Sequence, residues 1–331
     1  MKILVLGGTI FLGRHLVEAA LERGHEVTLF NRGKHNSDLF PSVVKIRGDR
    51  DGGLDSLKGR RWDAVIDTCG YVPRVVKQSA EMLSESAAHY TFISSISVFA
   101  DTSKSGIDEN GELRRLDDPT IEAVTGETYG GLKVLCEESA ELAFPGRALN
   151  IRPGLIVGPH DPTDRFTYWP VRVNKGGDIL TPQDHDVPVQ VIDVRDLAEW
   201  NIRMIEAKEV GVYNATGPDY VLTFGALMDA CDADTKAPAN RVHVSEEWLT
   251  EKEVHAWSDL PVWIPDVPEM HGFARIDCSK AISDGLTFRP IRQTALDTLN
   301  WAGTRPTEYE LAAGLKPDRE QALLAEWAAR A

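Results

Sequence analysis

The chain of 331 residues carries 51 acidic and 36 basic side chains, a formal net charge of −15. This balance argues against nucleic acid or an anionic membrane surface as the main partner, because phosphate contacts need clustered Lys and Arg. Hydrophobic residues at 42% and charged residues at 26% are ordinary globular values. Four cysteines without a CxxC pair indicate neither a metal site nor a disulfide framework, and no apolar run is long enough to span a membrane. We therefore expect a cytoplasmic protein with reduced thiols and no bound metal.

The first thirteen residues predict a strand, a glycine turn and a helix. Residues 3–6 form a short apolar run typical of a strand buried on both faces of a parallel sheet. Two glycines interrupt it, and apolar residues follow at helical spacing over 11–21. The unpaired amides and positive dipole at such a helix start favour a phosphate group. We therefore expect this turn to bind a dinucleotide through Gly7, Gly8, Thr9, Ile10, Phe11, Leu12 and Gly13.

Strands and helices alternate along the rest of the first half. Further strands are predicted at residues 26–31, 43–46, 64–66, 90–94 and 148–152. Helical spacing predicts helices at 75–83 and 128–142. The alternation indicates the α/β class, with a Rossmann-type doubly wound parallel sheet in a dinucleotide-binding domain over residues 1–158.

The character of the sequence changes after residue 158. Prolines and tryptophans become frequent and the strict alternation of strands and helices ends, which indicates a smaller, irregular substrate-binding domain over 159–331. Residues 187–214 contain two further strand-like runs and are expected to return to the main sheet. Ligands of open α/β sheets bind outside the carboxyl ends of the strands, where such a second domain would close over them.

The end of the second predicted strand favours NADP over NAD. An acidic residue there would accept hydrogen bonds from the adenosine ribose, but the chain has Asn31 followed by Arg32, and a guanidinium suits a 2′-phosphate. A solvated basic turn is the alternative explanation of Arg32, with NAD as the alternative cofactor. Asp49, after the third strand, is placed to accept from the adenine amino group, and a turn-forming role is the alternative.

Tyr129 and Lys133 lie four residues apart on a predicted helix, and hence on one face. A cation close to a phenol can lower its pKa by roughly 1 to 3, which brings proton transfer within reach of neutral pH. A carbonyl or alcohol substrate needs that proton while hydride moves. Serines at positions 94, 95 and 97 follow the fifth strand, where a hydroxyl could bind the same substrate oxygen, although strand-end capping also explains Ser94 or Ser97.

These motifs resemble those of extended or atypical short-chain dehydrogenases/reductases, the group called the NAD-dependent epimerase/dehydratase family. The resemblance covers most of the chain, through the glycine turn and residues 48–51, 94–99, 129–133, 152–159 and 194–198. It implies that Tyr129 is the general acid/base and that Ser95 polarises the substrate oxygen. It also implies that Lys133 binds the nicotinamide ribose and lowers the pKa of the tyrosine. A homodimer that pairs through a four-helix interface is a further family-level expectation.

The resemblance adds cofactor contacts at the ends of later strands. Those contacts are Arg50, Thr68, Cys69, Gly70, Ser94, Pro153, Leu155 and Ile156. One departure concerns the glycine turn, where Ile10 stands in the place of the family's middle glycine. Either Gly8 supplies the close approach to the pyrophosphate, or the cofactor binds more weakly.

Other departures bear on the substrate. Family dehydratases carry an Asp-Glu pair after the active-site hydroxyl, where this chain has Ile96 and Ser97, so dehydration by that route is not expected. The Asn and Arg that hold the diphosphate of a nucleotide sugar align with Leu155 and Val189. Each lost charge-assisted hydrogen bond is worth roughly 1.5 to 3 kcal/mol, so we expect a small molecule other than a nucleotide sugar. Candidate substrate contacts are Tyr71, His160, Arg165, Tyr168 and Trp169.

Three functions fit these residues. The leading one is an NAD(P)-dependent oxidoreductase that interconverts a carbonyl and an alcohol, and a sugar epimerase acting by transient oxidation would use the same residues. The third is a binding protein that keeps its cofactor as a structural ligand, because the opening Gly-Gly-Thr-x-Phe-Leu-Gly resembles that of the chloroplast stem-loop RNA-binding branch of the family. The acidic net charge and the intact Ser95, Tyr129 and Lys133 set count against this third function.

Overall fold

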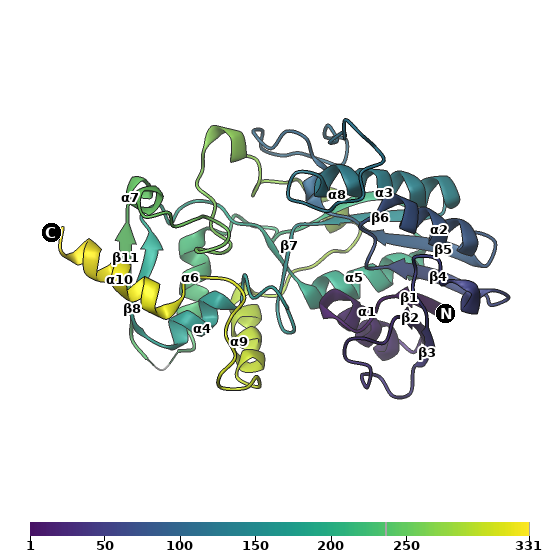
Figure 1. Cartoon of the computed structure of the whole chain (residues 1–331), viewed down its shortest axis with the longest axis horizontal. Coiled ribbons are helices and arrows are strands. Elements are labelled where there is room, and N and C mark those ends of the chain that lie inside the picture. The colour runs from purple at the N-terminus through teal and green to yellow at the C-terminus, as the bar shows by residue number, and fades with distance from the viewer. Residues whose placement is uncertain (236, 331) are drawn as a thin grey trace.

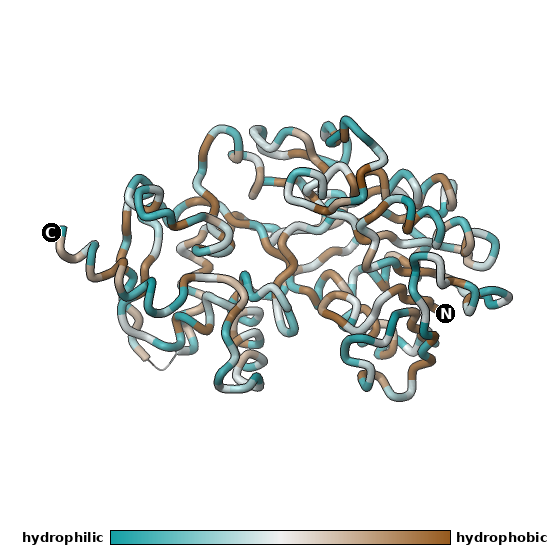
Figure 2. The backbone as a smooth tube through the Cα atoms, in the orientation of Figure 1, coloured by the Kyte–Doolittle hydropathy of each residue, from teal (hydrophilic) through white to brown (hydrophobic). Residues whose placement is uncertain are grey.

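The computed structural model describes residues 1–235 and 237–330, which form two lobes (Figure 1). The larger lobe contains the N-terminus and is built on a seven-stranded sheet. The smaller lobe contains the last helix and a two-stranded sheet. Hydrophobic stretches run through the interior of both lobes, whereas many peripheral loops are hydrophilic (Figure 2).

The large sheet is parallel throughout, which confirms the expected Rossmann-type α/β class. Its strands lie in the order β10-β6-β5-β4-β1-β2-β3. They are β1 (Lys2–Leu6), β2 (Glu26–Asn31), β3 (Val44–Arg47), β4 (Trp62–Asp67), β5 (Ala87–Ile93), β6 (Ala148–Pro153) and β10 (Gly211–Ala215). Chain order reverses between β1 and β4, and an open α/β sheet forms its ligand crevice at such a reversal.

Helices cover both faces of this sheet because successive strand residues point to opposite sides. Ile3 and Val5 of β1 belong to the core on the face of α1 and α5, whereas Leu4 and Leu6 belong to the core on the face of α2 and α3. The helices are α1 (Phe11–Glu22), α2 (Pro73–Leu83), α3 (Tyr129–Ala143) and α5 (Val194–Ala207), with the short α8 (Ser279–Ser283) beside β10. Burial on both faces explains why β1 is an uninterrupted apolar run.

The smaller lobe has a separate hydrophobic core. Strand β8 (Gly177–Pro182) pairs in parallel with β11 (Ala239–Val244). The helices of the lobe are α4 (Tyr168–Asn174), α6 (Phe224–Asp232), α7 (Glu246–Glu251), α9 (Ile291–Ala302) and α10 (Pro317–Ala328). Trp169, Trp248 and Trp263 are buried in this core, so these tryptophans of the second half serve packing.

Residues 187–214 return to the large lobe only in part. Strand β9 (Val191–Asp193) pairs with β7 (Leu155–Val157) in a two-stranded sheet of its own, so the run at 189–192 lies outside the main sheet in which it was expected. Helix α5 then packs on α1, and β10 pairs with β6. The chain therefore crosses between the lobes more than once.

Candidate functional site

A cavity of about 840 Å³ lies along the carboxyl ends of the large sheet. Its walls come from the segments that follow β1 to β6, and from residues 161–165, Trp257 and Phe273. The backbone after β6 contributes Pro153, Leu155 and Ile156. This volume is typical of ligand sites, and the cavity lies at the reversal of strand order where α/β proteins bind nucleotides.

The glycine turn fits the pyrophosphate of a dinucleotide. Gly7 and Gly8 have φ angles of 111° and 89°, which other residues rarely adopt. A Cβ at Gly7 would lie 2.5 Å from Thr68 Oγ1, and one at Gly13 would lie 2.8 Å from the Gly8 amide nitrogen. The whole turn from Gly7 to Gly13 lines the cavity, so the unpaired amides at the start of α1 border the space left by these missing side chains.

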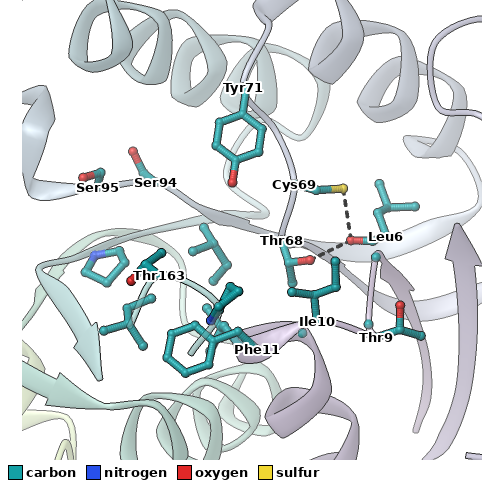
Figure 3. Close-up of a pocket in the computed structure, with 18 of the residues that line it drawn as sticks. Leu6, Thr9, Ile10, Phe11, Thr68, Cys69, Tyr71, Ser94, Ser95 and Thr163 are labelled. Carbon is teal, nitrogen blue, oxygen red and sulfur yellow. Dashed lines mark hydrogen bonds between the residues drawn. The ribbon is translucent and has the colours of Figure 1, made fainter. Parts of the chain in front are cut away.

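Ile10 stands at the mouth of this cradle. Its φ of −128° and ψ of 137° are ordinary extended backbone, so isoleucine replaces the usual glycine without strain. Its side chain is 46% exposed and lines the cavity beside Phe11 (Figure 3). An apolar group therefore occupies room at the helix start, where phosphate oxygens would accept hydrogen bonds from amides.

At the end of the cavity that follows β2, Asn31 supports the backbone. Its Nδ2 donates to the Gly7 carbonyl over 2.9 Å, and its Oδ1 accepts from the Gly33 amide over 2.9 Å. Arg32 and Lys34 line the same end and are exposed. Within the described chain, neither makes an ion pair or a side-chain hydrogen bond. Both cations are therefore free to meet a phosphate.

Asp49 and Arg50 border the cavity after β3, but both also hold structure. Asp49 Oδ1 accepts from the Asp51 amide over 3.1 Å, the turn-forming role considered as its alternative. Arg50 donates two hydrogen bonds of 2.6 Å to Asp67 and one of 2.8 Å to Ser79 Oγ. The expected cofactor contact of Arg50 stays a prediction, because its terminal nitrogens bind protein groups while its Nε has no partner among the described residues and the residue lines the cavity.

The carboxylate of Asp67 is fully buried at the end of β4. Burial alone would raise its pKa, but the charge of Arg50 and the hydrogen bonds from Arg50 and Tyr90 lower it below its usual value. The Tyr90 hydroxyl donates to Asp67 Oδ2 over 2.8 Å. This network lies beneath the cavity floor and fixes the turn that follows β4.

Thr68 and Cys69 are placed at that turn, where the resemblance puts the cofactor's central ribose. Thr68 Oγ1 donates to the Leu6 carbonyl over 2.9 Å, and the Cys69 thiol also points at this oxygen (Figure 3). Burial raises the pKa of that thiol, so it stays protonated. Gly70 does not line the cavity, and its carbonyl accepts from Lys133.

Ser95 and Tyr129 meet at the other end of the cavity. Tyr129 begins helix α3, and Ser95 precedes the short helical turn at residues 96–98. Burial raises the pKa of the Tyr129 phenol, and the nearby Ser95 hydroxyl lowers it by less. Ser95 Oγ also accepts from the Ser97 amide over 3.1 Å. The phenol is therefore protonated at neutral pH and can donate.

Ser94, next to this pair, has a buried hydroxyl oxygen that lacks a hydrogen-bond partner within residues 1–235 and 237–330, and its side chain lines the cavity. An orphaned buried hydroxyl costs roughly 1 to 3 kcal/mol until a partner reaches it. Tyr71 projects its hydroxyl between Ser94 and Cys69 (Figure 3). The Tyr71 and Tyr129 rings lie 6.4 Å apart between centroids.

Lys133 is 3% exposed, and its Nζ donates to the carbonyl oxygens of Gly70 (2.8 Å) and Ile93 (2.7 Å). Burial lowers the pKa of Lys133 to about 8. The resemblance implies that Lys133 lowers the pKa of Tyr129, but the main lowering effects come from Ser95 and the charge of Arg165, and burial outweighs them. The expected effect of Lys133 on Tyr129 stays a prediction.

Of the candidate substrate contacts, Tyr71 and Arg165 line the cavity and three others do not. Tyr168 and Trp169 are buried in the core of the smaller lobe, where Trp169 Nε1 donates to the Pro261 carbonyl over 2.6 Å. His160 lies outside the cavity, 5.1 Å from the Trp301 ring between centroids. Apolar packing explains the two buried aromatics, and the structure brings none of the three side chains to the cavity.

Several lining residues, Lys34 among them, were not predicted from the sequence. Those at the end of the cavity near Arg165 include Asp161, Thr163, Trp257 and Phe273. The two aromatic residues lie on segments remote from the motifs, and no local pattern separates them from the buried aromatics of the same lobe. The described residues contain no group of three metal-ligating side chains, and none of their helices has the length and apolarity required to cross a membrane.

Residues 3–216, which carry the turn, Ser95, Tyr129 and Lys133, match the model of the NAD dependent epimerase/dehydratase family. The chain belongs to this family. The matched segment ends just after β10, the last strand of the large sheet. Most of the smaller lobe therefore lies outside the match.

Two relatives of this epimerase/dehydratase family member have names that describe different functions, stem-loop binding in one and reduction in the other. The chloroplast stem-loop binding protein of 41 kDa b from Arabidopsis thaliana is 28% identical over 253 residues, which are 70% of this chain and 62% of that protein. The chain thus spans less than two thirds of that relative. Over 49 residues, 15% of each protein, it is 49% identical to 2-alkyl-3-oxoalkanoate reductase from Stenotrophomonas maltophilia (strain K279a).

Among solved structures, UDP-glucuronic acid 4-epimerase from Bacillus cereus in complex with NAD has the same fold. The similarity covers 92% of this chain and 99% of the epimerase, with a TM-score of 0.63 and 17% identity. Identity at this level establishes the architecture and leaves the substrate to be argued from the cavity.

Proposed function

We propose that this family member is an NADP-preferring oxidoreductase that interconverts a carbonyl and an alcohol on a small molecule. The observation that carries the proposal is a single cavity that contains the glycine turn at one end and Ser95 with Tyr129 at the other. The partial similarity to a protein named 2-alkyl-3-oxoalkanoate reductase supports the same chemistry.

The proposed roles follow from the protonation states of the side chains. A nicotinamide cofactor supplies or accepts hydride when it is bound in the cavity. Tyr129, whose raised pKa keeps it protonated, donates its proton to the carbonyl oxygen, and Ser95 donates a hydrogen bond to the same oxygen. Lys133 and Ser94, whose hydroxyl is unpaired among the described residues, both line the cavity and would hold the ribose and amide groups of the cofactor.

The preference for NADP rests on Arg32 and Lys34. Both are exposed cations that line the adenosine end, and within the described residues neither has an acidic partner. A guanidinium binds a phosphate through two parallel hydrogen bonds, which a ribose hydroxyl cannot match. NAD would leave both cations without that ligand.

A nucleotide sugar does not fit as the substrate, because two residues that would have to hold its diphosphate are buried and apolar. Leu155 and Val189, which align with the polar residues that hold the diphosphate in nucleotide-sugar enzymes, are 7% and 3% exposed. Both belong to the hydrophobic core of the smaller lobe, so no charge-assisted hydrogen bond is available there.

The proposed function is tested by following NADPH absorbance with a panel of small aldehydes, ketones and oxo acids. Tyr129→Phe should lower kcat by roughly 10²- to 10⁴-fold, the usual contribution of general acid/base catalysis, and leave the NADPH dissociation constant unchanged. If wild type reduces none of the compounds in the panel, or if wild type and Tyr129→Phe have equal kcat, the proposed function is refuted.

An epimerase acting by transient oxidation is the second candidate, because the structural match includes a UDP-glucuronic acid 4-epimerase. Conversion of a UDP-sugar without net change in NADPH absorbance would favour it. The similarity to a stem-loop binding protein raises RNA binding as a third. Retention of a labelled RNA stem-loop at 150 mM salt by wild type would favour that function, and the net charge of −15 opposes it.

The family-level expectations of a homodimer and a cytoplasmic location remain part of this proposal. Helices α2 and α3 pack together on one face of the sheet and would form the four-helix interface with a second copy. Light scattering of the purified chain would give a mass near twice 36.6 kDa if the dimer forms.

A further inference from the structure

The end of the cavity beyond Tyr129 contains an arginine without an acidic partner. Arg165 is half-buried on the segment between β7 and α4 and lines the cavity. Its Nε donates to Thr163 Oγ1 over 3.2 Å. No carboxylate of the described chain forms an ion pair with its guanidinium, so the two terminal nitrogens remain available.

Asp161, the acid whose charge acts on Arg165, is bound elsewhere. Its carboxylate accepts from the Thr163 amide over 2.8 Å and from the Thr163 hydroxyl over 2.8 Å. The Thr163 side chain therefore contacts both the acid and the guanidinium. Burial raises the pKa of Asp161, whereas the hydrogen bonds from Thr163 and the charge of Arg165 lower it. Within residues 1–235 and 237–330, Asp161 therefore acts on the arginine without forming a direct ion pair with it.

Aromatic rings fix the position of the guanidinium. Its central carbon lies 5.2 Å from the centroid of the Trp257 ring, which is within cation–π distance. Phe273 packs edge-on against Trp257 with centroids 5.7 Å apart, and both rings line the cavity. The arginine thus contacts both the polar Thr163 and the aromatic Trp257.

Arg165 shares its compartment with the proposed acid/base. Its positive charge is among the effects that lower the pKa of the Tyr129 phenol, and the phenol in turn raises the pKa of Arg165. Burial is the larger effect on Arg165 and lowers its pKa overall, because the guanidinium has lost part of its hydration. An anion at this position would restore the lost interactions.

We propose that the substrate is an oxo acid whose carboxylate binds Arg165 and whose apolar or aromatic body lies against Trp257 and Phe273. This inference rests on the proposed oxidoreductase function. Because Nε is bound to Thr163, the two terminal nitrogens donate in parallel to the carboxylate oxygens. In the reduction, the carbonyl carbon gains hydride from NADPH, its oxygen gains the Tyr129 proton, NADP⁺ forms, and the carboxylate is unchanged.

A carboxylate suits the site better than a phosphate because only one free cation is present among the described lining residues at this end. Lys133 is bound to the carbonyl oxygens of Gly70 and Ile93. A single guanidinium balances a monoanion, whereas a phosphate dianion is usually held by several cations or by a cluster of amides.

The binding test uses two probes that differ only in charge, phenylacetate and phenylacetamide, titrated calorimetrically with saturating NADP⁺. Wild type should bind phenylacetate at least tenfold more tightly than the amide. Arg165→Met should remove this difference, Arg165→Lys should reduce it, and Arg61→Met should keep it. Arg61 is the matched control because it is exposed and precedes β4.

Equal affinity for acid and amide, no measurable binding of either, or a preserved difference in Arg165→Met would overturn the inference. Tighter binding of benzylphosphonate than of phenylacetate would also overturn it, since that would assign the site to phosphate. The binding test requires no turnover, so it is independent of the Tyr129→Phe test. If NADPH is consumed equally with 3-oxo-octanoate and its methyl ester, the oxidoreductase proposal stands and the carboxylate site fails.

Discussion

The carbonyl oxygen of Ile93 lies 2.7 Å from Lys133 Nζ at the end of β5. A second carbonyl, that of Gly70, lies 2.8 Å from the same atom, so the end of β5 and the segment after β4 share one buried ammonium group. The lysine therefore has a structural function besides any contact with the cofactor. Its position imposes a cost, because burial disfavours its charged form and lowers its pKa to about 8.

We expect this cost to appear in the pH dependence of stability. Between the folded pKa of about 8 and the unfolded value of about 10.4, the unfolded chain binds more protons. The free energy of unfolding of wild type should thus rise with pH relative to Lys133→Met, by roughly 3 kcal/mol across the window. Urea titrations at pH 7, 8, 9 and 10 measure this. Lys77→Met, at an exposed site on α2, should parallel wild type, and parallel curves for Lys133→Met would contradict the prediction.

The ion pair of Arg50 and Asp67 predicts a large loss of stability. Arg50→Met leaves a fully buried carboxylate with only Tyr90 and a backbone amide as donors, and breaking one side of such a pair typically costs about 3 to 5 kcal/mol. Arg50→Met combined with Asp67→Asn should recover part of the loss. Chemical denaturation with urea measures the free energy of unfolding of both variants.

Arg74 provides the matched control for that prediction. It makes two-pronged pairs with Asp51 and with Glu122, each over 2.7 and 3.1 Å, but all three side chains are about half exposed. Solvent screens an exposed ion pair, so Arg74→Met should have little effect on the free energy of unfolding. If both variants lose the same free energy of unfolding, burial is not what gives the Arg50 pair its importance.

Arg32 predicts a change in cofactor preference. Arg32→Ala should weaken NADPH binding by roughly 10- to 100-fold, the equivalent of a charge-assisted hydrogen bond, and leave NADH binding unchanged. Fluorescence titration of the two reduced cofactors gives both constants. Arg61→Ala, at an exposed position before β4, should leave the ratio intact. An unchanged ratio in Arg32→Ala would assign the residue to a solvated turn.

Replacing Ile10 by glycine should strengthen cofactor binding. Its side chain is 46% exposed and borders the start of α1, so Ile10→Gly removes little buried area and opens the helix amides to phosphate. Glycine is also tolerated at a helix N-cap. The NADPH dissociation constant should fall by up to about tenfold, with the urea midpoint nearly constant. Weaker binding would show that Ile10 contacts the cofactor favourably.

The large lobe could be predicted because its signals are local. The apolar run at residues 3–6, the glycines that follow and the alternation of later elements need only nearest neighbours along the chain. The boundaries agree well, since the predicted strand at 26–31 is β2 and the predicted helix at 128–142 is close to α3. The path of 189–192 was not predictable, because β9 pairs with a strand that also leaves the main sheet.

Side-chain roles were harder to predict where partners are distant in sequence. Arg50 belongs to a recognisable motif, but its partners Asp67 and Ser79 lie 17 and 29 residues away, and only the fold brings them together. Trp169 and Trp257 look alike in the sequence, yet one is buried in the core and the other lines the cavity. Burial distinguishes them, and burial depends on the tertiary structure.

The free cations of the cavity lie within a chain of net charge −15. A phosphate- or carboxylate-bearing ligand is repelled at long range and attracted only after it enters, within a Debye length of about 8 Å at physiological ionic strength. Added salt should therefore accelerate association by screening the repulsion, and accelerate dissociation by weakening the contacts inside. Two electrostatic fields of opposite sign therefore act on an approaching ligand, a negative one from the molecular surface and a positive one from the cavity.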